Sequence, residues 1–267
     1  MLKLRYPANC IVCGSALPAG VWGQWDSTTR SVTCAPCART GPPDATPPTP
    51  SALDRGQPGA SAQREYWRRR RNREARKRSR HPHIGGLLLA LERTPRHESA
   101  FLRGADGEEA VAKSLARRTA KGGAIVLHDR RMPRGHGNID HLAIAPIGVY
   151  VIDAKDISGK VRVSRPLFGA AKLLVKGRNR SKLVDGLDRQ VAAVRKALGD
   201  IGHADVPVVG VFCFTKADLP LFGSSEIHRH RLHHRRALAR KLNKSGPFGR
   251  EAIDALARGL ASAFPSA

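Results

Sequence analysis

Apolar, β-forming residues dominate a stretch near the middle of the chain and predict a β-hairpin there. Two β-rich runs flank a turn centred between Pro146 and Ile147. With the turn centred there, the numbers of opposed residues sum to 293, so Asp140 faces Asp153. Because side chains alternate between the two faces of a strand, Asp140, Asp153 and Lys155 are expected to project to one side.

Apolar residues at helical spacing predict helices before and after this hairpin. Asp106 is a natural N-cap with Glu109 completing a capping box, and the neighbouring Glu108 then points toward the core. A later helix, residues 181–198, carries Gln190 on the margin of its apolar stripe, where Gln190 either reaches substrate or is satisfied at the edge of the core. A last helix is expected to serve packing. The three stripes consist of Val111 and Leu115, then Leu183, Leu187, Val191, Val194 and Leu198, and finally Ile253, Leu256, Leu260 and Phe264.

A polar linker and a strongly basic segment come earlier in the chain. Residues 41–63 are rich in Pro, Gly and Ser and have almost nothing apolar to bury, which indicates a linker. Residues 64–80 contain neither Gly nor Pro, so we expect a helix of roughly 25 Å whose thin apolar stripe does not dock firmly. Its ten basic and two acidic side chains favour phosphate contact over a merely solvated face. The candidate phosphate-binding residues are Arg68, Arg69, Arg70, Arg71, Arg73, Arg76, Lys77, Arg78 and Arg80.

The charge of the whole chain indicates a polyanionic partner. Lys and Arg number 47 against 22 Asp and Glu, which gives a net charge of +25 and a pI near 11.1. Nucleic acid is favoured over an anionic membrane surface. The longest apolar run, Leu87–Leu91, is far shorter than the roughly 18 residues of a membrane span, and the N-terminus lacks a secretory signal. We therefore expect a cytoplasmic protein that does not act at a membrane, with cysteines that are reduced or bound to metal.

Four cysteines near the N-terminus have the spacing of a zinc site. Cys10 and Cys13 form one C-x2-C pair, and Cys34 and Cys37 form a second pair twenty residues later. Two such turns can complete a tetrahedral four-sulfur shell around Zn²⁺, with short strands between them as in a zinc ribbon. The compartment disfavours disulfides, and a redox C-x2-C does not need a second pair. Because a closed four-cysteine site has no open position for catalysis, the zinc is expected to be structural.

The opposed carboxylates of the hairpin point to a second metal. Cβ atoms of opposed residues lie roughly 5 Å apart, close enough for Asp140 and Asp153 to share a divalent cation. Without a cation, two opposed carboxylates on an otherwise apolar face repel each other and resist burial. The alternative is a salt bridge between Lys155 and Asp153 with no catalytic role.

Several stretches of the second half occur in a characteristic order. They are Gly104–Val111, Val126–Asp129, Asn138–His141 and Gly148–Lys155, with fainter matches at Gln190 and Val206–Phe212. In this order they resemble the nuclease-related domain, a branch of the restriction-endonuclease-like PD-(D/E)XK superfamily. The resemblance implies an α/β fold with a mixed central sheet flanked by helices, and a phosphodiesterase site that depends on Mg²⁺ or Mn²⁺. Many members have Glu where this chain has Asp153, a shorter acid that still binds metal.

The resemblance also implies a role for each site residue. Asp140 is the metal-ligating Asp, Asp153 and Lys155 are the acid and the lysine of the D-x-K element, Glu108 is the helix acid, and Gln190 is the later-helix glutamine. A cation held by Asp140, Asp153 and the carbonyl oxygen of Ala154 is expected to polarise the scissile phosphate and to lower the pKa of a bound water, which Lys155 orients or deprotonates.

These observations predict a nuclease that hydrolyses DNA, or else RNA, in DNA processing or repair. The rival hypothesis is a catalytically inactive nucleic-acid-binding module whose zinc ribbon recruits a partner protein. The expected organisation is a zinc ribbon at 1–40, a linker at 41–63, a basic and helical segment at 64–95 and the nuclease-related domain at 96–267. The ribbon and the basic segment resemble appendages of bacterial members of the family.

Overall fold

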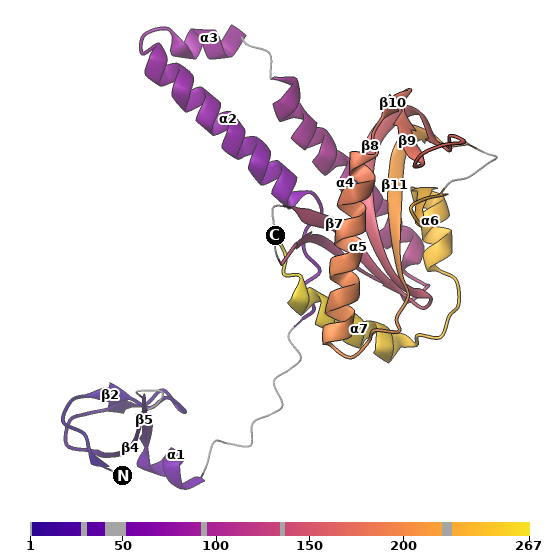
Figure 1. The fold of residues 1–267 in the computed structure, drawn as a ribbon. Coiled ribbons are helices and arrows are strands. Elements are labelled where there is room, and N and C mark those ends of the chain that lie inside the picture. Colours follow the sequence, from indigo (N-terminus) through magenta and orange to yellow (C-terminus); the bar gives the residue numbers. More distant parts are fainter. Residues whose placement is uncertain (1, 28–30, 41–51, 92–94, 134–136, 221–225) are drawn as a thin grey trace. The chain divides into compact units, whose positions relative to one another are not determined.

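Figure 1 shows the fold in a computed structural model of the chain, which describes residues 2–27, 31–40, 52–91, 95–133, 137–220 and 226–267. The contacts divide the chain into two compact units, Met1–Ala52 and Leu53–Ala267. The core of the predicted linker, residues 41–51, lies outside the described residues. In the described part of the chain, no helix has the length and apolarity to cross a bilayer.

The first unit is rich in short strands and ends in a short helix. Its elements are β1 (Leu2–Lys3), β2 (Ala8–Asn9), β3 (Ala16–Leu17), β4 (Trp22–Asp26), β5 (Ser31–Cys34) and α1 (Ala35–Thr40). β4 and β5 pair antiparallel where the sequence predicted two strands, β1 extends their sheet, and β2 and β3 form a separate hairpin. Among the residues of this unit that the structure describes, Leu4, Leu17 and Val32 join Cys10 and Cys34 in the buried core. A unit with so small a core needs a further stabilising link, which its cysteines can supply.

The second unit is built around an eight-stranded mixed sheet. Its strands are β6 (Ile125–Arg131), β7 (Asn138–Ala145), β8 (Gly148–Ser164), β9 (Lys172–Val175), β10 (Arg178–Asn179), β11 (Val208–Asp218), β12 (Glu226–Ile227) and β13 (His230–His234). Its helices are α2 (Ala60–Arg80), α3 (Gly85–Leu91), α4 (Arg96–Thr119), α5 (Lys182–Asp200), α6 (Arg235–Leu242) and α7 (Arg250–Ala263). β7 is antiparallel to β8, whereas β11 is parallel to it. The predicted α/β fold with a mixed central sheet is therefore confirmed.

Helices cover both faces of this sheet (Figure 1). Residues of α4 and α6 form one buried core with one face, and residues of α5 and α7 form another core with the opposite face. Along β8, Val149 and Val151 join the α5 side while Tyr150 and Ile152 join the α4 side. This alternation is what the hairpin pattern predicted, since successive side chains of a strand point to opposite faces.

The long strand β8 changes partners along one of its edges. Its first part pairs with β7 up to Ile152, and its last part pairs with β9 from Val161 onward. In the first part, His141 lies opposite Ile152, which confirms the predicted register in which opposed numbers sum to 293. Among the described strands, β11 alone is hydrogen-bonded to β8 between these two regions. The edge of the sheet is therefore open at Asp153 and Lys155.

The basic helix α2 packs against α4 (Figure 1). Tyr66 of α2 is buried, and the guanidinium of Arg69 lies 4.7 Å from the centre of the Phe101 ring of α4. Arg73 forms an ion pair of 2.8 Å with Glu98 of α4, which is almost wholly buried. The prediction that this helix does not dock firmly is wrong, because its partners on α4 lie outside the basic run that the prediction considered.

Helix α4 begins at Arg96, well before the N-cap predicted at Asp106. Asp106 lies in the middle of the helix, and Glu109 accepts hydrogen bonds from Lys113 at 3.1 Å and from Gln63 at 3.3 Å instead of closing a capping box. The local pattern was misleading because the first turns of α4 are supported by α2, a contact between segments distant in sequence.

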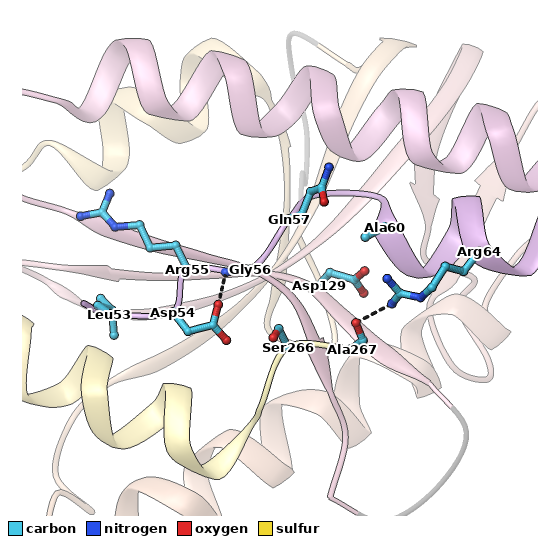
Figure 2. Close-up of a pocket in the computed structure, with 10 residues that line it drawn as sticks. All are labelled: Leu53, Asp54, Arg55, Gly56, Gln57, Ala60, Arg64, Asp129, Ser266 and Ala267. Carbon is cyan, nitrogen blue, oxygen red and sulfur yellow. Dashed lines mark hydrogen bonds between the residues drawn. The ribbon is translucent and has the colours of Figure 1, made fainter. Parts of the chain in front are cut away.

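The segment Leu53–Gln63 belongs to the second unit and packs on its other residues, although the sequence assigned it to the linker (Figure 2). The carbonyl of Arg55 accepts a hydrogen bond of 2.7 Å from the His128 N–H. Gly56 and Gly59 have left-handed φ values of 68° and 75°, and a Cβ on Gly59 would lie 2.9 Å from Ala105 Cα. These glycines therefore permit close docking. The predicted linker extends too far at its C-terminal end.

Asp129 of β6 fixes the start of α2. The backbone N–H and the hydroxyl of Ser61 donate to its carboxylate at 2.6 and 2.7 Å, and Asn138 Nδ2 donates to it at 2.9 Å. Asp129 also lines a cavity of about 490 Å³ between the docked segment and the C-terminal residues (Figure 2), where Arg64 donates to the carbonyl of Ala267. None of the predicted catalytic residues lines this cavity among the residues that the structure describes.

Candidate active site

Asp140 and Asp153 lie at the open edge of the sheet, where β7 and β8 separate. Asp140 Oδ2 accepts a hydrogen bond of 2.8 Å from the Ala154 N–H, one step beyond the last hydrogen-bonded pair of the hairpin. Asp153 is buried. The hairpin therefore brings both predicted acids to the same place from neighbouring strands.

Lys155 adds a positive charge to this pair. Its ammonium contacts Asp153 Oδ1 and lies 3.4 Å from the carbonyl oxygen of Ala154. Burial lowers the pKa of Lys155, but the carboxylates of Asp153 and Asp140 outweigh that effect and raise its pKa overall. The neighbouring carboxylates therefore favour the protonated form of Lys155, whose ammonium can orient a water or a phosphate oxygen.

Glu108 approaches the same region from α4. Its Oε2 accepts a hydrogen bond of 3.0 Å from the N–H of Gly59, in the segment that the sequence assigned to the linker. Burial, followed by the nearby carboxylate of Asp129, raises the pKa of Glu108 to about 7. The charges of Asp153 and Lys155 also act on it. Glu108 therefore shares the electrostatic environment of the acid pair.

The chemistry of this cluster fits a divalent cation. Burial, together with the charges of Glu108 and Asp153, raises the pKa of Asp140 well above its usual range, and Lys155 only partly offsets this. A bound cation favours the ionised form of such a carboxyl group. Among the described acidic residues, no three have carboxylate oxygens within 4.8 Å of one another. Glu108 thus does not form a compact three-acid site with Asp140 and Asp153.

Gln190 of α5 contacts the strand that carries Asp140. Its Nε2 donates a hydrogen bond of 2.9 Å to the carbonyl oxygen of Asn138, two residues before Asp140. Its Oε1 is buried and has no hydrogen-bond partner among the described residues. The Nε2 hydrogen bond fits the alternative in which Gln190 is satisfied at the edge of the core. Its Oε1 could still accept a hydrogen bond from a substrate.

A cavity of about 600 Å³ adjoins Lys155, and sequence reasoning did not identify its other charged residues. It is lined by Arg103 of α4, Lys176 and Arg180 near β10, and Lys216 of β11. Arg103 and Lys216 are far in sequence from Lys176 and Arg180, so their meeting could not be read from the sequence. The sequence signal that could have been used is the stretch 157–184 around Lys176 and Arg180, which contains eight basic and no acidic side chains.

The four cysteines of the first unit lie together. The four sulfur atoms, those of Cys10, Cys13, Cys34 and Cys37, all lie within 4.8 Å of one another. The Cys13 and Cys34 sulfurs are 3.8 Å apart. A zinc–sulfur distance of about 2.3 Å in a tetrahedral shell separates sulfurs by about 3.8 Å. Hydrogen bonds, first from the Cys34 N–H, lower the pKa of Cys10 to about 6, whereas contacts with the other cysteines, Cys34 first, raise the pKa of Cys37 to about 12. The Cys10 thiolate is therefore favoured at neutral pH, and metal binding requires that the other thiols lose their protons as well.

Several of the predicted phosphate-binding residues of α2 form ion pairs within the protein. Arg68 and Arg69 pair with Glu65, and Arg70 pairs with Glu74, all near the helix surface. Arg73 pairs with the buried Glu98, which makes it an anchor between α2 and α4. Arg71 in the middle of α2 and Arg78 and Arg80 at its C-terminal end are exposed and form no ion pair with any residue that the structure describes.

The mixed sheet and its edge of two acids and a lysine define a nuclease-like α/β domain. Residues 103–215 match the family model of the nuclease-related domain. The matched range contains all five predicted catalytic residues, from Glu108 to Gln190. No curated protein and no solved structure matches the chain.

Proposed function

We propose that the second unit is a nuclease that hydrolyses phosphodiester bonds of DNA with Mg²⁺ or Mn²⁺. The observation that carries this proposal is the convergence of Asp140, Asp153 and Lys155 at the open edge of the sheet, inside the range that matches the nuclease-related domain. Two acids and a lysine at one edge suit a reaction in which a metal ion and a protonated amine both neutralise phosphate charge.

Each residue of the site has a distinct proposed role. Asp140, Asp153 and the carbonyl oxygen of Ala154 hold the cation, which when bound activates a water and polarises the phosphate. Lys155, kept protonated by its acidic neighbours, orients the water and balances charge that develops on the phosphate. Glu108 and Gln190 act from α4 and α5, Glu108 through its charge and Gln190 by holding β7 beside Asp140.

The remaining parts of the chain have supporting roles in this proposal. The four cysteines bind one structural Zn²⁺, because their sulfurs already have the spacing of a tetrahedral site. The exposed arginines of α2, Arg71, Arg78 and Arg80, bind phosphates without reading sequence. The rival function, an inactive nucleic-acid-binding module, needs the basic surface but does not need the acid pair.

The test is incubation of the full chain with circular and linear, single- and double-stranded DNA and RNA, in Mg²⁺, Mn²⁺ or EDTA. We expect cleavage in either metal and none in EDTA. Lys155→Ala should lose cleavage, whereas Lys160→Ala, an exposed lysine of the same strand, should keep it. Binding without cleavage of any substrate would favour the inactive module and refute the nuclease.

A further inference from the structure

The cavity beside Lys155 is formed where several elements meet. α4 contributes Arg103, the region of β9 and β10 contributes Lys176 and Arg180, and β11 contributes Lys216. It lies beside the stretch of β8 that β7 and β9 leave open, so it continues directly from the proposed catalytic edge. We call this cavity of about 600 Å³ the basic groove.

The side chains of the basic groove are held in place by the fold. Lys176 has a left-handed φ of 51° at the turn before β10, and its Nζ donates to Ser158 Oγ at 3.3 Å. Its stem crosses β8 at Gly159, where a Cβ would lie 3.0 Å from Lys176 Cε. Arg103 donates to Ser99 Oγ at 3.0 Å and forms no ion pair with a described carboxylate, although its charge acts on Asp156. The groove is therefore a shaped site, in which a glycine makes room for a lysine.

Positive charge in the basic groove exceeds what its own acid neutralises. Lys216 pairs with Asp156 at 3.0 Å, and Lys155 contacts Asp153. Arg103, Lys176 and Arg180 form no ion pair with any described residue, so three cations remain available.

We propose that the basic groove binds successive phosphates of the polynucleotide strand next to the bond that is cut, and that it recognises the backbone rather than the bases. This inference rests on the proposed nuclease function and extends it to the substrate class. Each phosphodiester carries one negative charge, so three available cations match several phosphates of a strand better than they match one mononucleotide. The position of Lys155 at the groove places this strand in line with the catalytic edge.

The residues that line the basic groove also support the proposal that it does not recognise bases. Among its described residues there is no aromatic side chain on which a base could stack and no Asn or Gln that could pair with a base edge. The apolar residues of the lining, Ile157, Val175 and Leu183, offer neither an aromatic ring nor a side-chain amide. Binding is therefore expected to be independent of sequence and dependent on salt.

The test compares two double variants that remove the same charge. Lys176→Gln/Arg180→Gln alters the groove, and Lys244→Gln/Arg250→Gln alters exposed residues near the β7–β8 turn, at the other end of β8. Affinity for labelled oligonucleotides of two unrelated sequences, single- and double-stranded, is measured in EDTA between 50 and 200 mM salt. Urea unfolding confirms that both variants are folded.

Losing two phosphate contacts should flatten the plot of log affinity against log salt by about 1.4 for single strands and about 1.8 for duplexes. Over this fourfold salt range the wild type should then lose about sevenfold more single-strand affinity than the groove variant. The weakening should be equal for both sequences, and adenosine monophosphate should compete poorly. A salt slope like that of the control, a weakening confined to one sequence, or displacement by the mononucleotide would each overturn the proposal.

Together with the cleavage assay in Mg²⁺ or Mn²⁺, this binding experiment separates the inference from the nuclease assignment. Reduced affinity of the groove variant in a protein that cleaves nothing would support the groove and refute the nuclease. Normal cleavage by the wild type with an unchanged slope in the groove variant would refute the groove and support the nuclease.

Discussion

Replacing Gly59 by alanine should destabilise the second unit more than the same change at a matched glycine. Gly59 precedes α2, has a φ of 75°, and donates its N–H to Glu108. Gly202 follows α5, has a φ of 82°, and has no atom within 4 Å of the place where a Cβ would be. The two glycines therefore share the left-handed conformation and differ in what surrounds them.

The magnitude follows from two separate effects. A Cβ in the left-handed conformation costs about 1–2 kcal/mol, and this applies to both variants. At Gly59 the new Cβ would also lie 2.9 Å from Ala105 Cα and 3.1 Å from Ala105 O, so α2 and α4 must move apart. Overpacking of this kind costs about 1–3 kcal/mol more. We expect a loss of about 2–5 kcal/mol for Gly59→Ala and about 1–2 kcal/mol for Gly202→Ala.

The assay is urea unfolding followed by far-UV circular dichroism, because most of the helical residues belong to the second unit. The difference in midpoint, multiplied by the common slope, gives the difference in unfolding free energy. A Gly59→Ala variant no less stable than Gly202→Ala would refute the conclusion that the segment before α2 docks closely on α4.

Three further predictions concern the metal, the helix contact and pH. Metal analysis of chelator-free protein should find about one zinc per chain, lost in Cys10→Ser, and retained zinc in that variant would refute the four-cysteine site. Arg73→Ala should lower the unfolding free energy by about 3–5 kcal/mol, because it leaves the buried Glu98 unpaired. Arg71→Ala, the control, should change the unfolding free energy little. Equal effects of the two changes would refute the anchoring role of Arg73. In EDTA, the unfolding free energy should fall as pH rises from about 4.5 to about 7, because folded Glu108 holds its proton more tightly than Glu108 of the unfolded chain. Glu108→Gln should remove that decline. A Glu108→Gln variant with the wild-type pH profile in urea unfolding would contradict this prediction.

The central hairpin could be predicted from sequence because its information is local. The turn at Pro146 set the register, and the alternation of side chains along a strand set the faces; the position of Asp140 beside β8 followed from both. The same holds for the cysteine pairs, whose spacing brings four sulfurs together. In both cases the residues that determine the arrangement lie within a short stretch of the sequence, so local geometry is enough to predict it.

Contacts between distant segments could not be predicted in this way. Gly59 looked like a linker glycine because nothing in its neighbourhood indicates the Ala105 backbone against which it packs. Arg73 looked like one of many phosphate-binding arginines because its partner Glu98 belongs to another helix. The basic groove was missed for the same reason, since its cations come from α4, the β10 region and β11 and meet only in the folded protein.

The most direct test of the proposed function is cleavage by Asp140→Asn in Mg²⁺ or Mn²⁺. Asparagine keeps the size of the side chain and an oxygen for the hydrogen bond from the Ala154 N–H, but it removes the charge that the cation needs. Asp200→Asn, on the exposed end of α5, is the matched control. The proposal predicts that Asp140→Asn loses cleavage while it binds DNA in EDTA like the wild type, and that Asp200→Asn retains both; wild-type cleavage by Asp140→Asn would contradict it.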